Sequence, residues 1–156
     1  MVLKAAFGRS MSLGTFGITQ VVIDVESVSN ILLGRFPVHD RLHTLPGALL
    51  VAAGVTVLFR APLSFVYARL QKREDVASWI SHELVDVSWL SAAMGAFLGG
   101  VTHVLFDGMM HADARPFAPL VAGNPLLIAD GFVAIHIGCA ILGALGFLAW
   151  ILRFSR

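Results

Sequence analysis

The sequence predicts an all-α membrane protein, a multi-pass transmembrane four-helix bundle that forms a single integral domain over residues 1–156. Hydrophobic residues make up 57% of the chain and charged residues only 13%, whereas soluble domains use roughly 45–50% and about 25%. The mean hydropathy is +0.81. Because one crossing needs about 20 apolar residues, the chain has room for about four spans and for no separate soluble domain.

The first span is expected over residues 12–33, an apolar segment that is polar on one side. Gly34 and Pro37 follow this segment and should end the helix, since proline cannot continue one. Asp24 and Glu26 lie inside the segment. A carboxylate in a spanning helix is costly, so these two side chains should face a partner or water rather than lipid.

The second and third spans are expected over residues 45–66 and 87–106. Pro46 lies in the first turn of the second span, where a helix tolerates proline. The third span contains Gly95 and Gly99. Small residues at a spacing of four allow two membrane helices to approach closely, so we expect this helix to pack tightly against a neighbour.

The fourth span is expected over residues 126–152, which also contain several glycines. A polar link over residues 69–86 joins the second span to the third. The link is rich in charge and contains Trp79. This composition is typical of a segment at the membrane–water interface.

Basic residues beside the spans predict the orientation of the chain, because Lys and Arg are enriched on the cytoplasmic side. Those near the two ends of the chain and in the polar link are Lys4, Arg9, Arg60, Arg69, Lys72, Arg73, Arg153 and Arg156. The other side carries only Arg35, Arg41 and Arg115. We therefore expect a protein of the bacterial inner membrane with both termini in the cytoplasm.

Side chains that bind metals gather on the opposite, non-cytoplasmic face of this topology. His103, Asp107 and His111 follow one another at a spacing of four, so they share one face if the helix continues. His39 and His43 lie in the turn before the second span. The topology brings both groups to the same face as the carboxylates in the second half of the first span.

Imidazole and carboxylate ligands suit a divalent transition metal, zinc above all. A catalytic site keeps about three protein ligands and an open position for water, whose pKa the metal lowers towards neutrality. We expect His43, His103 and Asp107 as ligands, with Asp24 as a further ligand or a bridging carboxylate. Asp24 and Glu26 are the candidate catalytic carboxylates. The residues that complete a second metal site or orient the ligands are Glu26, His39 and His111.

Three motifs occur in a characteristic order: Asp24-Val25-Glu26, His39-Asp40-Arg41-Leu42-His43-Thr44-Leu45 and His103-Val104-Leu105-Phe106-Asp107. Together they resemble the small bacterial membrane-bound metal-dependent hydrolases, in which these elements usually read Pro-Asp-x-Asp, His-Arg-x-x-Thr-His-Ser and His-x-x-x-Asp. In this chain Ile23 replaces the proline, Glu26 replaces the second aspartate, and Thr44 follows the histidine instead of preceding it. The resemblance implies a membrane-embedded hydrolase that acts on an ester or phosphoester of a lipid-like or other substrate at the non-cytoplasmic face.

Two other classes of function fit the same residues. A b-type cytochrome would ligate haem with His103 and either His136 or His43. A non-enzymatic accessory subunit would pack its glycine-rich faces against a larger membrane complex. The expected partners are membrane lipid and either a second copy of the chain or such a complex. Nucleic acid is not expected, because the net charge is only +1 and the basic residues are scattered.

Overall fold

The computed structural model describes residues 2–72 and 87–154, and within these ranges the chain forms five α-helices, one 3-10 turn and no strand. The elements are α1 (Val2–Phe7), the 3-10 turn η1 (Gly8–Ser10), α2 (Leu13–Leu32), α3 (Leu45–Leu70), α5 (Trp89–Met110) and α6 (Gly131–Phe154). The prediction of an all-helical bundle is therefore confirmed.

Hydroxyl side chains begin the three helices of the central core. Ser12, Thr44 and Ser88 each accept a hydrogen bond from the backbone N–H three residues later. Such a cap satisfies one of the donors that the first turn of a helix leaves unpaired. At the other end of α2, Gly34 has φ of +62°, a left-handed conformation that glycine adopts without strain. It closes a Schellman motif that ends the helix where the sequence predicts.

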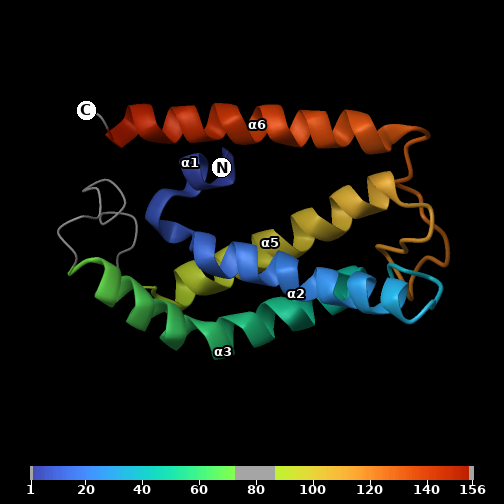
Figure 1. Cartoon of the computed structure of the whole chain (residues 1–156), viewed down its shortest axis with the longest axis horizontal. Helices are drawn as coiled ribbons and strands as arrows, with labels where there is room; N and C mark the ends of the chain where they lie inside the picture. The colour runs from blue at the N-terminus through green and yellow to red at the C-terminus, as the bar shows by residue number, and fades with distance from the viewer. Residues whose placement is uncertain (1, 73–86, 155–156) are drawn as a thin grey trace.

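α5 is the central helix and packs against both α2 and α3 (Figure 1). Small residues on α5 let the backbones approach, and Gly95 and Gly99 lie against the carbonyl groups of Ser12 and Phe16. The close packing predicted from the glycine spacing is confirmed. The buried apolar residues of this core include Ile23, Ala48, Ala52, Val55, Ala96 and Val104.

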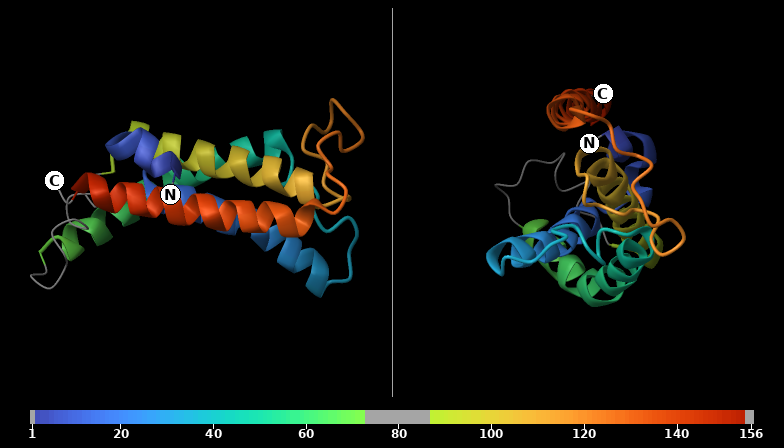
Figure 2. Two further views of the ribbon diagram at one scale, coloured as in Figure 1. Left: turned by 90° about the horizontal axis from the view of Figure 1, so that it is seen from above. Right: turned by 90° about the vertical axis from the view of Figure 1, so that its right-hand side faces the viewer.

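α6 runs beside this three-helix core, and α1 lies between them (Figures 1 and 2). Among the described residues, α6 packs mainly against α1 and α5. Its outer surface is apolar, and Val133, Ile137 and Ile141 are all exposed. A helix that is apolar nearly all round is typical of a membrane span, since lipid then covers its surface.

Among the described residues, the helices that are long and apolar enough to cross a membrane are Leu45–Leu70, Trp89–Met110 and Gly131–Leu152. α2 forms over nearly the predicted residues but is not one of them, so three potential spans are shown rather than the predicted four. Polar side chains, Asp24 and Glu26 among them, lower the hydropathy of α2. These same side chains take part in the site described below.

The helices also end at places that hydropathy did not predict. α3 continues to Leu70 and α5 to Met110, past the expected ends at residues 66 and 106. α6 begins at Gly131, not at residue 126, after Asp130 with φ of +56°. The loop between α5 and α6 is therefore long, and Asp107 lies inside a helix. Most of the predicted interfacial link, residues 73–86, lies outside the described residues.

Candidate metal centre

Four ligand-type side chains from three separate parts of the chain meet at one end of the core. Asp24 comes from α2, His43 from the loop before α3, and His103 and Asp107 from successive turns of α5. One ligand atom from each lies within 4.8 Å of the others. The sequence predicted these four residues as metal ligands, and the fold brings all four together.

Asp107 lies at the middle of this cluster. Its Oδ2 atom is 3.3 Å from Nε2 of His43 and 3.3 Å from Nε2 of His103. Oδ1 of Asp24 is 3.2 Å from the same nitrogen of His103 and 3.9 Å from that of His43. Two imidazole nitrogens and two carboxylate oxygens thus point at a common centre, a donor set that suits a tetrahedral divalent ion.

Glu26 holds His43 in the orientation that such a site requires. Its Oε2 atom accepts a hydrogen bond of 3.1 Å from Nδ1 of His43. Because a carboxylate only accepts, Nδ1 of His43 donates this bond, and Nε2 is the nitrogen that faces the cluster, where it also lies 3.3 Å from the hydroxyl oxygen of Ser27. Glu26 also accepts the backbone N–H groups of Arg41 and Leu42, both at 2.9 Å. A carboxylate behind a ligating histidine is a common outer partner in zinc sites.

His103 offers a second indication that the cluster fits a cation. Its Nε2 atom is buried and lies 3.2 Å from Oδ1 of Asp24 and 3.3 Å from Oδ2 of Asp107, but it makes a well-aligned hydrogen bond to no described residue. A metal ligand is the role that this position suits, because the nitrogen faces two carboxylates.

The electrostatics of the cluster favour a positive charge. Burial lowers the pKa of His43, but hydrogen bonds and charge interactions with Asp107 and Glu26 outweigh this effect, and the pKa of His43 is raised. The carboxylates therefore stabilise a proton on this imidazole. A divalent cation among the same carboxylates would be stabilised for the same reason.

A second cluster lies beside the first and consists of His39, His111 and Asp113. Oδ1 of Asp113 lies 3.0 Å from Nδ1 of His39, and its Oδ2 accepts the backbone N–H groups of Val38 and His39. Burial alone would raise the pKa of Asp113, but these hydrogen bonds lower it. The ring of His39 stacks on that of His111 at 4.1 Å and meets that of His43 edge-on at 4.8 Å.

His111 reaches this second cluster because α5 ends before it. The prediction that His103, Asp107 and His111 share one helix face is wrong for His111, because this residue is the C-cap of α5 and has extended backbone angles. Asn124 holds the new chain direction by donating to the carbonyl oxygens of Gly108 and His111. Burial and the nearby His39 lower the pKa of His111.

Asp113 is the ligand-type residue that sequence reasoning missed. It lies two residues after His111, a spacing that has no meaning on a helix. Only a prediction that the helix ends at residue 111 could have placed Asp113 beside the histidines. His136, the alternative haem ligand, is in neither cluster; it is exposed on α6, and its Nδ1 donates to the carbonyl oxygen of Phe132 at 2.7 Å.

Replacing Glu26 tests its positioning role. In Glu26→Gln, one carboxylate oxygen is replaced by an NH2 group that only donates, so the side chain loses its charge and one of the two oxygens that accept from Arg41, Leu42 and His43. We expect zinc affinity to fall by roughly 10- to 100-fold, the usual effect of losing an outer partner. Competition with a chromogenic zinc chelator measures it. The control is Asp40→Asn, an exposed position in the same loop; equal affinities in the two variants would contradict the role.

Comparison of the chain with protein-family models, curated proteins and solved structures gave no match.

Proposed function

We propose that this protein is a membrane-embedded, metal-dependent hydrolase that cleaves an ester or phosphoester at the non-cytoplasmic face of the bacterial inner membrane. The observation that carries the proposal is the convergence of Asp24, His43, His103 and Asp107 within 4.8 Å. The hydrogen bond that orients His43 and the buried Nε2 of His103, which faces two carboxylates, support it further.

Zinc is the ion that we propose for the first cluster, because nitrogen and oxygen ligands in this number suit it. A bound divalent cation would supply a Lewis acid and lower the pKa of a water molecule towards neutrality. The donor set favours an ion over haem. Nε2 of both His43 and His103 lies 3.3 Å from the carboxylate of Asp107, which occupies the space that a porphyrin would need.

The proposed catalytic role of Asp24 follows from its exposure. Its side chain is 54% exposed, whereas those of Asp107 and His103 are 13% and 10% exposed. Asp24 is thus the member of the cluster that an attacking water can reach. We propose that it accepts a proton from this water and passes it to the leaving alkoxide, while Asp107 and the two histidines hold the ion.

The proposed orientation puts both clusters outside and both chain termini in the cytoplasm. The loops that carry His39, His43, His111 and Asp113 lie at the end of the bundle opposite the C-terminal end of α6 (Figure 1). Arg60 stacks its guanidinium on the ring of Trp89 at 4.7 Å, and such pairs of basic and aromatic residues suit the cytoplasmic interface. We propose that α2 crosses with the other helices, its polar side turned to the site.

The test is hydrolysis of bis(4-nitrophenyl) phosphate and of a 4-nitrophenyl ester by the detergent-purified protein. We expect activity that a chelator abolishes and zinc restores, and a rate reduced by at least about 100-fold in Asp24→Asn, within the range for loss of general-base catalysis. The control is Asp40→Asn, which should keep the wild-type rate. Activity that persists with chelator, or in Asp24→Asn, would exclude this mechanism.

A further inference from the structure

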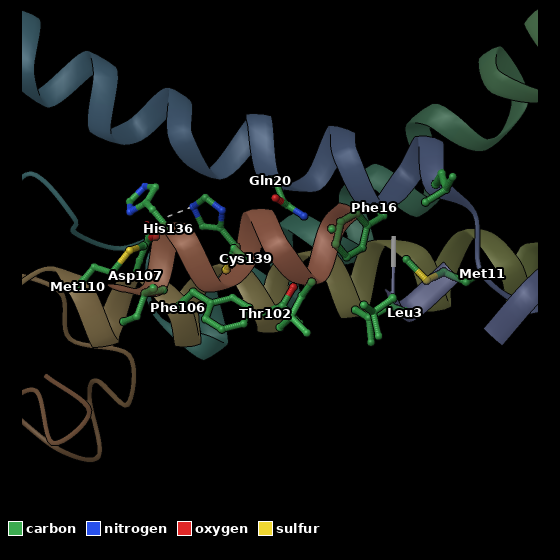
Figure 3. Close-up of a pocket in the computed structure, with 16 residues that line it drawn as sticks. Leu3, Met11, Phe16, Gln20, Thr102, Phe106, Asp107, Met110, His136 and Cys139 are labelled. Atoms are coloured by element: carbon green, nitrogen blue, oxygen red, sulfur yellow. Dashed lines mark ion pairs between the residues drawn. The ribbon is translucent and has the colours of Figure 1, made fainter. Parts of the chain in front are cut away.

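A cavity of about 570 Å³ lies between α6, α5, α2 and α1. Figure 3 shows Asp107 and His136 at one end of it and Leu3 and Met11 at the other. Most of its lining is apolar. The large apolar side chains that face it include Leu3, Met11, Phe16, Phe106, Ile135 and Leu142.

The polar end of this cavity reaches the first metal cluster. His103 and Asp107 line the cavity and are also members of that cluster. On α2, Phe16 and Gln20 line it at a spacing of four residues, and Asp24 follows one turn later. Residues four apart share one face of a helix, so this face of α2 leads from the apolar part of the cavity to the cluster.

We propose that the cavity binds one acyl chain of a membrane lipid and presents the ester or phosphoester at the head of that chain to the metal cluster. The substrate class is thus an amphiphile taken from the bilayer, not a water-soluble ester. Binding of the acyl chain does not depend on the proposed function, whereas cleavage at the head of that chain rests on it.

The dimensions of the cavity fit such a chain. Its volume lies within the roughly 300–1,000 Å³ of small-molecule sites. Along α6 its lining runs from Ile135 to Gly143, a length of about 12 Å at about 1.5 Å per residue. An elongated apolar space suits an extended hydrocarbon chain better than a compact polar group, which would lose its hydrogen bonds with water there.

The surroundings of the cavity indicate a lipid as the source of the chain. One wall is α6, which is apolar enough to cross a membrane and exposes apolar side chains on its other face. Only a single helix therefore separates the cavity from bilayer hydrocarbon. Hydrolysis would join the water oxygen to the carbonyl carbon or phosphorus, break the bond to the leaving alcohol and return a proton to its oxygen through Asp24.

Two neighbouring positions on α6 give a matched pair of variants. Leu142 lines the cavity and is 53% exposed, whereas Ile141 does not line it and is 55% exposed. Leu142→Trp should fill the cavity, and Ile141→Trp should add the same ring to the outer surface. Cys139→Phe fills the cavity at a second position and covers the case in which Leu142→Trp fails to fold.

The probe is lysophosphatidylglycerol with one palmitoyl chain, counted on the full-length protein by native mass spectrometry. Zinc content is measured on the same samples. We expect one lipid per wild-type chain, retention in Ile141→Trp, and loss by at least about tenfold in Leu142→Trp and in Cys139→Phe. A homologue with a short acyl chain should bind more weakly, since less apolar surface is buried.

Equal lipid binding in wild type, Leu142→Trp and Cys139→Phe would overturn the cavity proposal, and bound zinc in those samples would leave the proposed hydrolase standing. Loss of lipid in both cavity variants, from a protein that binds no zinc, would support the cavity proposal and refute the metal-dependent function. The two proposals can therefore fail separately.

Discussion

Zinc binding should disappear when Asp107 is replaced by Asn. Oδ2 of Asp107 lies 3.3 Å from Nε2 of His43 and 3.3 Å from Nε2 of His103, so this carboxylate lies next to both histidine ligands. The amide is nearly the same size but carries no charge. We expect affinity to fall by more than the roughly 10- to 100-fold expected for an outer partner such as Glu26. His103→Ala should have the same effect, because it removes a nitrogen ligand.

Elemental analysis of the detergent-purified proteins measures this loss. The matched control is Asp130→Asn, because Asp130 is exposed and its left-handed backbone conformation is one that Asn also adopts. We expect wild type and control to hold zinc in stoichiometric amounts. A second equivalent would belong to the cluster of His39, His111 and Asp113. If Asp107→Asn keeps as much zinc as the control, the first cluster is not the metal site.

The second large effect is expected at Gly95. A Cβ atom at this position would overlap the carbonyl oxygen of Ser12 and lie 2.5 Å from Oγ1 of Thr15. Neither group can move freely, because Ser12 caps α2 and Thr15 donates a hydrogen bond of 2.9 Å to the carbonyl oxygen of Ala92 on α5. Gly95→Ala should therefore push α2 and α5 apart and lower the free energy of unfolding by about 2–3 kcal/mol.

Gly54→Ala is the matched control for that substitution. Gly54 also lies inside a helix, but a Cβ atom there would meet nothing within 4 Å. Alanine favours a helix over glycine by about 0.8–1.0 kcal/mol, so this variant should unfold at the wild-type temperature or slightly above. Thermal unfolding followed by far-ultraviolet circular dichroism compares the two. Equal melting temperatures would mean that the α2–α5 contact is less tight than described.

The sequence alone predicts the local features of this protein. Composition indicates an all-helical membrane chain, Gly34 indicates the end of α2, and the spacing of Gly95 and Gly99 indicates close packing. The last two signals are local, because helix caps and helix faces involve residues only a few positions apart. The sequence predicted four spans, whereas three of the described helices are apolar enough to cross a membrane, since the polar side chains of α2 that serve the site lower the hydropathy of this helix.

The pairing of His103 with Asp107 was also predictable, because a spacing of four places both residues on one helix face. The tertiary structure decided the rest of the site. His43 meets these residues because Glu26 binds the backbone of its loop at Arg41 and Leu42.

Asp113 and His39 are far apart in the sequence. They can form their hydrogen bond because α5 ends at Met110 and the chain then turns towards the loop that contains His39. Local patterns identify which side chains can bind a metal. Which of them share an ion depends on where loops turn, and that is determined by contacts between residues far apart in the chain.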